Sequence, residues 1–187
     1  PQLLAADANT RVYFESAADF NGTVSDVISF KAWDRNMIWQ QLGVDIDSEA
    51  IRDKSGRSSL SADGQTVAIG AWRNDGNGTD AGHVRIYSWT GSAWSQLGAD
   101  IDGEKNDHWS GMRVSLSADG QTVAITARYY DGNGGSISAG GETRIYRWTG
   151  QAWSKLGADI DDEEGSVSVS LSADGQTVAV GDRWYDG

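Results

Sequence analysis

An internal repeat constrains the fold of this chain more than any other feature. The segment SLSADGQTVAI runs from Ser59 to Ile69 and recurs unchanged from Ser115 to Ile125. It appears again from Ser170 to Val180, with Val in place of the final Ile. The copies begin at residues 59, 115 and 170, which sets a period of about 56 residues. Such a period predicts a repeat protein in which each unit packs against its neighbours.

A second repeated block follows the first, and both blocks have the pattern of a β-hairpin. Residues His83–Gly98 recur as Glu142–Gly157. In the first block, Asp-Gly between two alternating apolar runs predicts a two-residue hairpin turn, since Gly tolerates positive φ. In the second, a Thr-Gly turn places two Trp across the hairpin, where aromatic pairs stabilise a sheet. Two hairpins give four antiparallel strands per repeat, and no window has a helical period.

Four antiparallel strands in about 56 residues are typical of a β-propeller blade. A β-solenoid has shorter repeats and tandem β-sandwich domains have longer ones. We therefore predict an all-β chain with about three blades' worth of strands. Residues Ile28–Gly43 align with the second hairpin of a repeat. The predicted parts are an N-terminal extension or edge strand (1–27), a half blade (28–55), two blades (56–110 and 111–165) and a half blade (166–187).

The two terminal half blades are complementary, but closing them within one chain would give a ring of three blades. Propellers usually have four to eight blades, and a smaller ring demands much larger angles between them. Three arrangements remain open. The chain is a fragment of a longer propeller, two chains form a six-bladed ring, or half blades pair between molecules in an open assembly. Unpaired strand edges favour such pairing, so we expect a homo-oligomer or polymer, or the remainder of a longer chain, as the partner.

Composition excludes several classes of function. The net charge of −12 and the pI near 4.4 disfavour nucleic acid as a partner. The chain has no Cys, which excludes disulfides, thiolate metal sites and Cys nucleophiles. No apolar run has the length of a membrane span. The chain starts at Pro1 without a Met, so we expect a processed product or a fragment.

Two Gly-rich loops between the second and third strands of successive repeats are candidate calcium sites. Oxygen-bearing side chains alternate with Gly in them, as Ca²⁺ ligation in a tight loop requires. No Glu closes the pattern, so a simple Gly/Asn-rich turn is the alternative interpretation. The candidate ligands are Asp75, Asn77 and Asp80 in one loop, and Asp131 and Asn133 in the other.

Acidic segments recur between the repeats, at Asp45–Glu49, Asp100–Glu104 and Asp159–Glu163. They are predicted to be solvated connectors anchored by an Ile, with cation binding as the alternative. Because these carboxylates recur with the repeat, choosing two as an acid and base pair would be arbitrary. The only two histidines, His83 and His108, are not at equivalent positions. We therefore predict that the chain is not an enzyme.

Aromatic pairs also recur, at Trp33/Trp39, Trp89/Trp94 and Trp148/Trp153. They are expected either to pack between adjacent blades or to form a surface that binds sugars. The second possibility makes a lectin-like propeller one alternative function. A hydrolase or lyase on a propeller scaffold is another, although such enzymes need polar residues that do not repeat.

The repeated strands resemble the FG-GAP repeat of integrin-α-type propellers over roughly residues 40–187. The matching segments are Gly56–Leu60, Val67–Ala71 and Gly82–Tyr87, and in the next copy Gly111–Leu116, Val123–Ala127 and Gly141–Tyr146. The chain departs from the family in having Ser55, Ser110 and Gly165-Ser166 where the leading Phe-Gly would be, and Trp72 and Arg128 in place of Pro. The Asp-rich calcium loop of the family is reduced to Ala-Asp-Gly-Gln, so that site is not carried over.

The N-terminal segment around Phe20–Asp34 is similar to cadherin-like repeats of large bacterial surface proteins. Together, the two resemblances imply an extracellular or cell-surface module for adhesion or self-assembly. Glycans or surface proteins are the partners that they imply.

Overall fold

The computed structural model describes residues 41–129, 139–162 and 168–181. The chain divides into two units, Pro1–Gln41 and Leu42–Gly187, and all the described strands lie in the second. The described residues contain no helix, and their sheets are antiparallel. This confirms the prediction of an all-β chain. Among the same residues, no helix suited to crossing a membrane is present. The predicted N-terminal extension and the hairpin at 28–43 lie outside the described residues, apart from 41–43.

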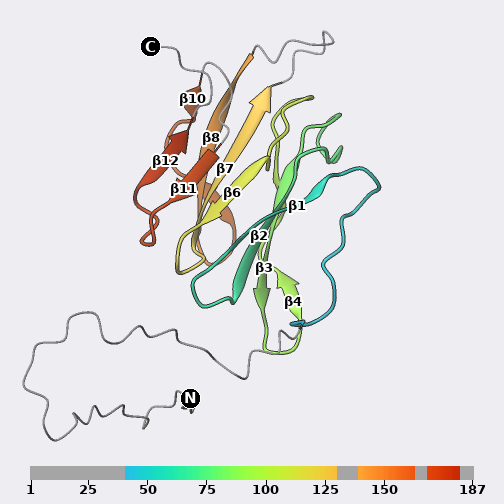
Figure 1. Cartoon of the computed structure of the whole chain (residues 1–187), viewed down its shortest axis with the longest axis vertical. Helices are drawn as coiled ribbons and strands as arrows, with labels where there is room; N and C mark the ends of the chain where they lie inside the picture. The colour runs from blue at the N-terminus through green and yellow to red at the C-terminus, as the bar shows by residue number, and fades with distance from the viewer. Residues whose placement is uncertain (1–40, 130–138, 163–167, 182–187) are drawn as a thin grey trace, which may run out of the picture. The chain divides into compact units, whose positions relative to one another are not determined.

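Each complete repeat forms one sheet in which four strands follow one another in space as in sequence (Figure 1). This confirms the prediction of four antiparallel strands per repeat. The first sheet consists of β1 (Ser55–Leu60), β2 (Thr66–Ala71), β3 (His83–Trp89) and β4 (Trp94–Gln96). The second sheet consists of β6 (Arg113–Leu116), β7 (Thr122–Tyr129), β8 (Ala139–Trp148) and β9 (Trp153–Lys155). The third sheet has two strands within the described residues, β11 (Ser168–Leu171) and β12 (Val178–Gly181).

The connectors between repeats add a fifth strand that the sequence did not predict. Strand β5 (Ile101–Asp102) pairs with the start of β3, and β10 (Ile160–Asp162) pairs with β8 in the same way. Ile101 is 5 % exposed, which confirms the predicted Ile anchor in this connector. The connectors are therefore part of the sheets rather than purely solvated links.

The Asp-Gly turn is longer than predicted. Ser61 and Thr66 pair across the hairpin, so four residues form the turn instead of two. The Asp63 carboxylate accepts hydrogen bonds from the Ser61 hydroxyl at 2.6 Å and from the Gln65 amide at 2.9 Å, while Gly64 has a φ of +72°. The side chain of Asp63 thus braces the turn, and this bracing needs the two extra residues. The same contacts recur around Asp119 and Asp174.

The Thr-Gly turns place the Trp pairs as predicted. Trp89 pairs with Trp94 across β3 and β4, with ring centroids 5.4 Å apart and planes at 61°. Trp148 and Trp153 pair across β8 and β9, with centroids 5.4 Å apart and planes at 50°. Trp33 and Trp39 lie outside the described residues. Both described pairs have the edge-on or tilted geometry that aromatic quadrupoles favour.

Each sheet has two unlike faces, because side chains alternate along a strand. We call the face that bears Leu60, Val67 and Ile69 the leading face of the first sheet, and the face that bears Ala68, Val84 and Ile86 its trailing face. Strand β6 lies against β1 and β2 on one side and against β11 on the other. The hydrophobic core fills the space between the trailing face of the first sheet and the leading face of the second. Its buried members are Ala68, Val84, Ile86, Ile101, Leu116, Val123 and Ile125.

Candidate functional site

We call the interface between two successive sheets a seam. The seam between the first and second sheets is built from the same contacts as the seam between the second and third. The Ala62 amide donates to the Ala118 carbonyl at 2.9 Å, and the Ala118 amide donates to the Ala173 carbonyl at 2.9 Å. A Ser hydroxyl of one repeat accepts a backbone hydrogen bond from a Leu of the next, also twice. These pairs are Ser59 with Leu116 and Ser115 with Leu171, each at 2.9 Å. The interface is therefore a property of the repeated motif.

The Leu-Gly segment at the end of each repeat forms a socket for the Trp pair of the next repeat. The Trp153 indole donates to the Leu97 carbonyl at 2.7 Å. A Cβ added to Gly98 would lie 2.7 Å from the Trp148 ring, so a side chain is excluded there. The socket at Leu42-Gly43 is the same, and the Trp94 indole donates to the Leu42 carbonyl at 2.8 Å. The described Trp pairs thus pack against the preceding repeat, as one of the two interpretations predicted.

The third socket, at Leu156-Gly157, differs from the other two. A Cβ added to Gly157 would meet nothing within 4 Å. Leu156 and Ile160 are 40 % and 38 % exposed, whereas Ile101, the equivalent of Ile160, is 5 % exposed. Within the described residues, this socket faces the two-stranded third sheet, which offers no third and fourth strand. In the described part of the chain, this Leu-Gly segment therefore lacks the Trp pair that packs on the other two.

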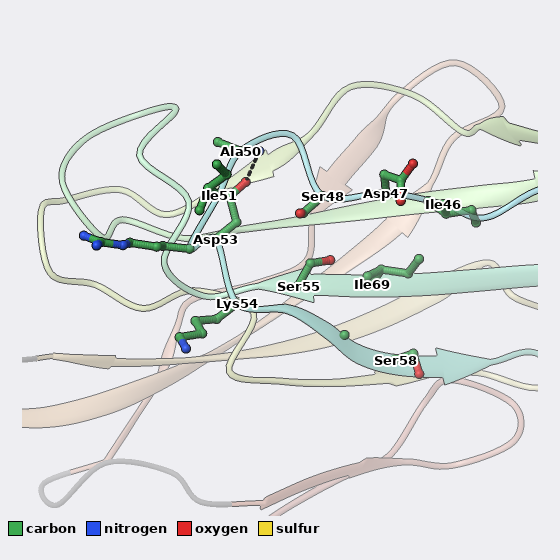
Figure 2. A pocket seen from close by; sticks show the side chains of 12 residues that line it. Ile46, Asp47, Ser48, Ala50, Ile51, Asp53, Lys54, Ser55, Ser58 and Ile69 are labelled. Carbon is green, nitrogen blue, oxygen red and sulfur yellow. Dashed lines mark hydrogen bonds between the residues drawn. The ribbon is translucent and has the colours of Figure 1, made fainter.

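The leading face of the first sheet is also uncovered among the described residues. Figure 2 shows an open depression between the first connector and strands β1 and β2, lined by Ile46, Ser58 and Ile69 among others. Leu60 is 57 % exposed on this face. In the second sheet, where the first sheet covers the leading face, Ile125 is fully buried. The depression therefore lies where a preceding sheet would pack.

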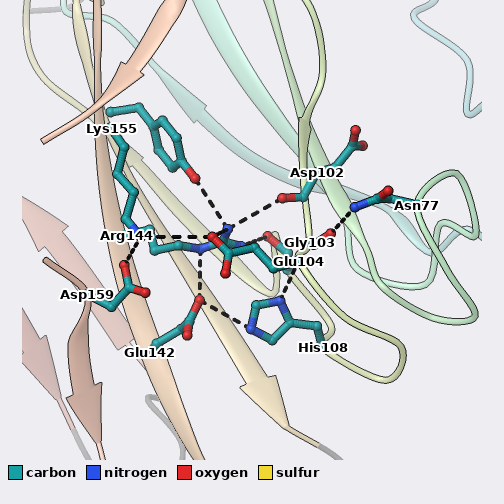
Figure 3. Close-up of polar contacts among 11 residues, drawn as sticks. Asn77, Asp102, Gly103, Glu104, His108, Glu142, Arg144, Lys155 and Asp159 are labelled. Carbon is teal, nitrogen blue, oxygen red and sulfur yellow. Dashed lines mark hydrogen bonds and ion pairs between the residues drawn. The ribbon is translucent and has the colours of Figure 1, made fainter.

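A buried arginine ties each of the first two acidic connectors to the sheet that follows it, and Figure 3 shows the second of these contacts. Arg144 Nη1 lies 3.2 Å from Glu104 Oε1, and its Nε lies 2.9 Å from Glu142 Oε1. In the first sheet, Arg85 Nη1 lies 3.4 Å from Glu49 Oε1. The Arg85 guanidinium also donates to the Asp47 carbonyl at 2.8 Å. The acidic connectors thus act as acceptors for an Arg of the following repeat. The sequence had shown these arginines only as part of the repeated Arg-Ile-Tyr pattern.

His108 belongs to the same network. Its Nδ1 accepts the Glu104 amide at 3.0 Å, so the ring proton is on Nε2. This Nε2 lies 3.2 Å from Glu142 Oε1. His108 and Glu142 are 0 % and 4 % exposed, and together with Arg144 they form a closed polar cluster. The arrangement holds Glu142 in place.

A second cluster contains the other histidine and was not predicted from the sequence. His83 begins β3, and its Nδ1 lies 3.4 Å from Asp100 Oδ2 and 3.9 Å from Glu49 Oε2. Burial lowers the pKa of His83 below its usual 6.5, against the opposing effect of Asp100. The imidazole is therefore neutral at neutral pH and is suited to accept a cation. The sequence does contain one signal for this cluster, which is a difference between the repeats: Glu142 occupies the position equivalent to His83.

The loop predicted to bind calcium uses its polar side chains for separate contacts. Asp75 Oδ1 accepts the Asp80 amide at 2.7 Å, and Asp80 Oδ2 lies 4.0 Å from the Arg73 guanidinium. Asn77 is turned toward the connector, where its amide donates to the Gly103 carbonyl at 2.8 Å (Figure 3). Asp131 and Asn133 lie outside the described residues. Calcium binding by these loops stays a prediction.

No known protein family matches this sequence, and no curated protein matches it either. The repeated seam and its sockets are therefore the main basis for assigning a function to the chain.

Proposed function

We propose that this chain is a non-catalytic repeat module that self-assembles by exchange of a β-hairpin. The hairpin predicted at residues 28–43 of one copy pairs with β12 of a second copy. It completes the third sheet of that copy with a third and a fourth strand. The composite sheet then has the four strands of the other two.

The open socket at Leu156-Gly157 carries this proposal. The two other sockets each hold a Trp pair and accept an indole hydrogen bond. The 28–43 hairpin carries Trp33 and Trp39, which align with Trp89 and Trp94. We call the Trp pair of such a hairpin its plug. The contacts between sockets and plugs within the chain thus define the contacts expected between copies.

Energetics favour such an exchange. Leu156 and Ile160 lose exposed apolar area when the hairpin docks, and burial of apolar area stabilises a complex. The leading face of the donor's first sheet, with the exposed Leu60, then covers the trailing face of β11 and β12. Each new ladder hydrogen bond contributes about 1 kcal/mol net. One association between two copies thus buries two faces that are otherwise uncovered: the leading face of the first sheet and the trailing face of the third.

Blades of an FG-GAP-like propeller are the arrangement that we propose for the completed sheets. At both interfaces, the trailing face of one sheet packs against the leading face of the next. This supports the arrangement, because a propeller packs each blade against the next in one rotational sense. The extracellular or cell-surface location is proposed from the resemblance of the strands and of the N-terminal segment.

The geometry favours assembly over the two alternative functions. A lectin surface needs exposed aromatic rings, whereas the two described Trp pairs pack against Gly43 and Gly98. A hydrolase or lyase acts through polar residues that do not repeat, whereas the connector carboxylates recur with the repeat and the non-repeated Glu142 is buried against Arg144 and His108.

Two full-length variants test the proposal by light scattering after size-exclusion chromatography. Trp33→Ala with Trp39→Ala removes the plug, and Leu156→Asp with Gly157→Asp blocks the socket. We expect the unmodified chain to be oligomeric and each variant to be monomeric. An equimolar mixture of the two variants should form a one-to-one dimer, because one keeps the socket and the other keeps the plug. Gln151→Asp, in the exposed turn between β8 and β9, is the matched control and should assemble normally.

A monomeric unmodified chain at high concentration would refute intermolecular exchange, particularly if residues 28–43 were protected from hydrogen exchange. That pattern would mean that the hairpin closes onto its own chain.

A further inference from the structure

One position differs in charge between the first and second sheets, although its surroundings are equivalent. In the second sheet, the Lys155 ammonium forms an ion pair with Asp159 Oδ1 and lies 3.9 Å from Glu104 Oε1 (Figure 3). This contact with Asp159 raises the pKa of Lys155, so a full positive charge lies between the two carboxylates. The first sheet has Gln96 at the equivalent position. Its side chain is neutral.

The carboxylates themselves are retained in the first sheet. Glu49 and Asp100 are the equivalents of Glu104 and Asp159. The Gln96 amide donates to Asp100 Oδ1 at 2.6 Å, which leaves Asp100 Oδ2 directed at His83. Arg85 lies beside Glu49 Oε1, while Glu49 Oε2 faces the same imidazole. Asp100 therefore has one oxygen held by Gln96 and the other directed at His83. Glu49 Oε2 faces His83 and also accepts the Asn74 side-chain amide at 3.5 Å.

His83 provides the third corner of this cluster. Its side chain is 1 % exposed, and its Nδ1 is the ring nitrogen that faces both carboxylates. One atom each of Glu49, His83 and Asp100 lie within 4.8 Å of one another. Among the described residues that act electrostatically on His83, three are carboxylates (Glu49, Asp100 and Asp102) and one is a cation, Arg85, so negative charge is in excess here. The connector glutamate of the first sheet thus has one cation beside it, Arg85, whereas Glu104 in the second sheet has two, Arg144 and Lys155.

We propose that Glu49, His83 and Asp100 bind a divalent transition-metal ion of the Zn²⁺ class, which replaces the ammonium found in the second sheet. Two ligand atoms at about 2.0 Å from a tetrahedral Zn²⁺ lie about 3.3 Å apart, and His83 Nδ1 lies 3.4 Å from Asp100 Oδ2. Imidazole with carboxylate suits Zn²⁺, whereas Ca²⁺ prefers six to eight oxygen ligands. Water completes the coordination.

Such an ion would join the first connector to β3, because Glu49 precedes β1 and His83 begins β3. It would lock the connector that leads from the 28–43 hairpin to the first sheet. The site lies within one chain, so the proposal does not rest on self-assembly.

Zinc titration of the full chain tests the site by calorimetry and by nitrogen-15 spectra of the imidazoles. The chain has only two histidines, so His108 serves as an internal control. We expect one Zn²⁺ per chain and a shift of the His83 nitrogens alone. Gln96→Lys places an ammonium between Glu49 and Asp100, and should weaken Zn²⁺ binding at least tenfold. Asp75→Asn, in the loop predicted to bind calcium, should leave it unchanged.

The assembly-deficient variant with Trp33→Ala and Trp39→Ala separates this proposal from the proposed function, since it should bind Zn²⁺ normally as a monomer. Because Gln96 is exposed, Gln96→Lys is expected to fold, and His83→Gln provides a second test. Unchanged Zn²⁺ binding in both variants would overturn the proposal. So would a response of His108 in place of His83, or equal binding of Ca²⁺.

Discussion

The first and second sheets share one sequence motif and one topology. They differ in how deeply their leading faces are buried and in the ion pairs that their arginines form. Leu60 is 57 % exposed, whereas its equivalent Leu116 is 7 % exposed because the first sheet packs on it. Arg85 pairs with a half-exposed Glu49, whereas Arg144 pairs with the buried Glu142. Equal sequences thus have unequal environments, which places much of the stability in the seams between sheets. This is the behaviour expected of repeat proteins.

The largest difference is expected between the two arginines. Arg144→Ala removes the guanidinium beside the buried Glu142 and leaves His108 as its neighbour, and breaking such a buried ion pair costs about 3–5 kcal/mol. Arg85→Ala breaks an ion pair with the more exposed Glu49 and should cost about 1 kcal/mol. Urea unfolding gives both free energies. Equal losses for the two variants would show that the closed cluster around Arg144 adds nothing.

A smaller difference is expected between the two leucines on the leading faces. Leu116→Ala opens a cavity in the core between the sheets and should lower the free energy of unfolding by about 2–4 kcal/mol. Leu60→Ala should change it by less than about 0.5 kcal/mol in the monomer, since surface substitutions have small effects. Thermal or urea unfolding of the plug-less monomeric variant measures both. A large loss for Leu60→Ala would mean that another part of the chain covers this face.

The sockets give a third comparison. Gly98 and Gly157 have φ values of +82° and +69°, so Ala at either position costs about 1–2 kcal/mol of backbone strain. Only at Gly98 would the added Cβ also clash with the Trp148 ring, and overpacking adds about 1–3 kcal/mol. Gly98→Ala should therefore be the more destabilising substitution in the monomer. Near-ultraviolet circular dichroism should report the displaced Trp pair.

The smallest effects are expected at the braced turns, where the two sheets are alike. A hydrogen bond from Ser117, and then one from Gln121, lowers the pKa of Asp119 below 3.8. The pKa of Asp63 is lowered for the same reasons. A lowered folded pKa gives stability that is present above the unfolded pKa and is lost as the pH falls through the folded pKa.

For Asp119, solvent screening limits this stability to a few tenths of a kcal/mol. Unfolding free energies from pH 6 down to below pH 3.8 should therefore fall slightly less steeply for Asp119→Asn than for the unmodified chain. Asp63→Asn should have a similar profile. A steep acid transition that both variants preserve would have to come from other carboxylates.

Local features of the fold were predictable because they depend on residues close in sequence. The alternation around Val67–Ile69 and the facing of Trp89 and Trp94 specify hairpins without reference to the rest of the chain. The turn is two residues longer than its Asp-Gly pair predicts, because the Ser61 hydroxyl and the Gln65 backbone amide both donate to Asp63. The fifth strand was missed because two residues such as Ile101–Asp102 carry no periodicity.

The candidate sites were less predictable because their partners are distant in sequence. Arg144 lies 40 residues from Glu104, and only the packing of successive sheets reveals that they meet. Asp75 and Asp80 belong to one oxygen-rich loop, so the sequence alone makes them candidates. The cluster around His83 contains residues of three separate segments, so local composition does not reveal it. Comparison of aligned repeats offers the better signal. The positions where copies differ, such as Gln96 against Lys155, identify where one repeat has a distinct role.

The near-identity of the repeated hairpins has a consequence for folding. Ser59–Ile69 and Ser115–Ile125 have the same sequence, so the contacts that these residues make between sheets do not distinguish one neighbour from another. During refolding, the third sheet can dock on the first and exclude the second, because the backbone and Ser contacts between sheets can form, although the Leu97-Gly98 socket then lacks its Trp pair. Escape from such a state requires the seam to open fully, which predicts a slow refolding phase whose amplitude grows with the number of identical copies.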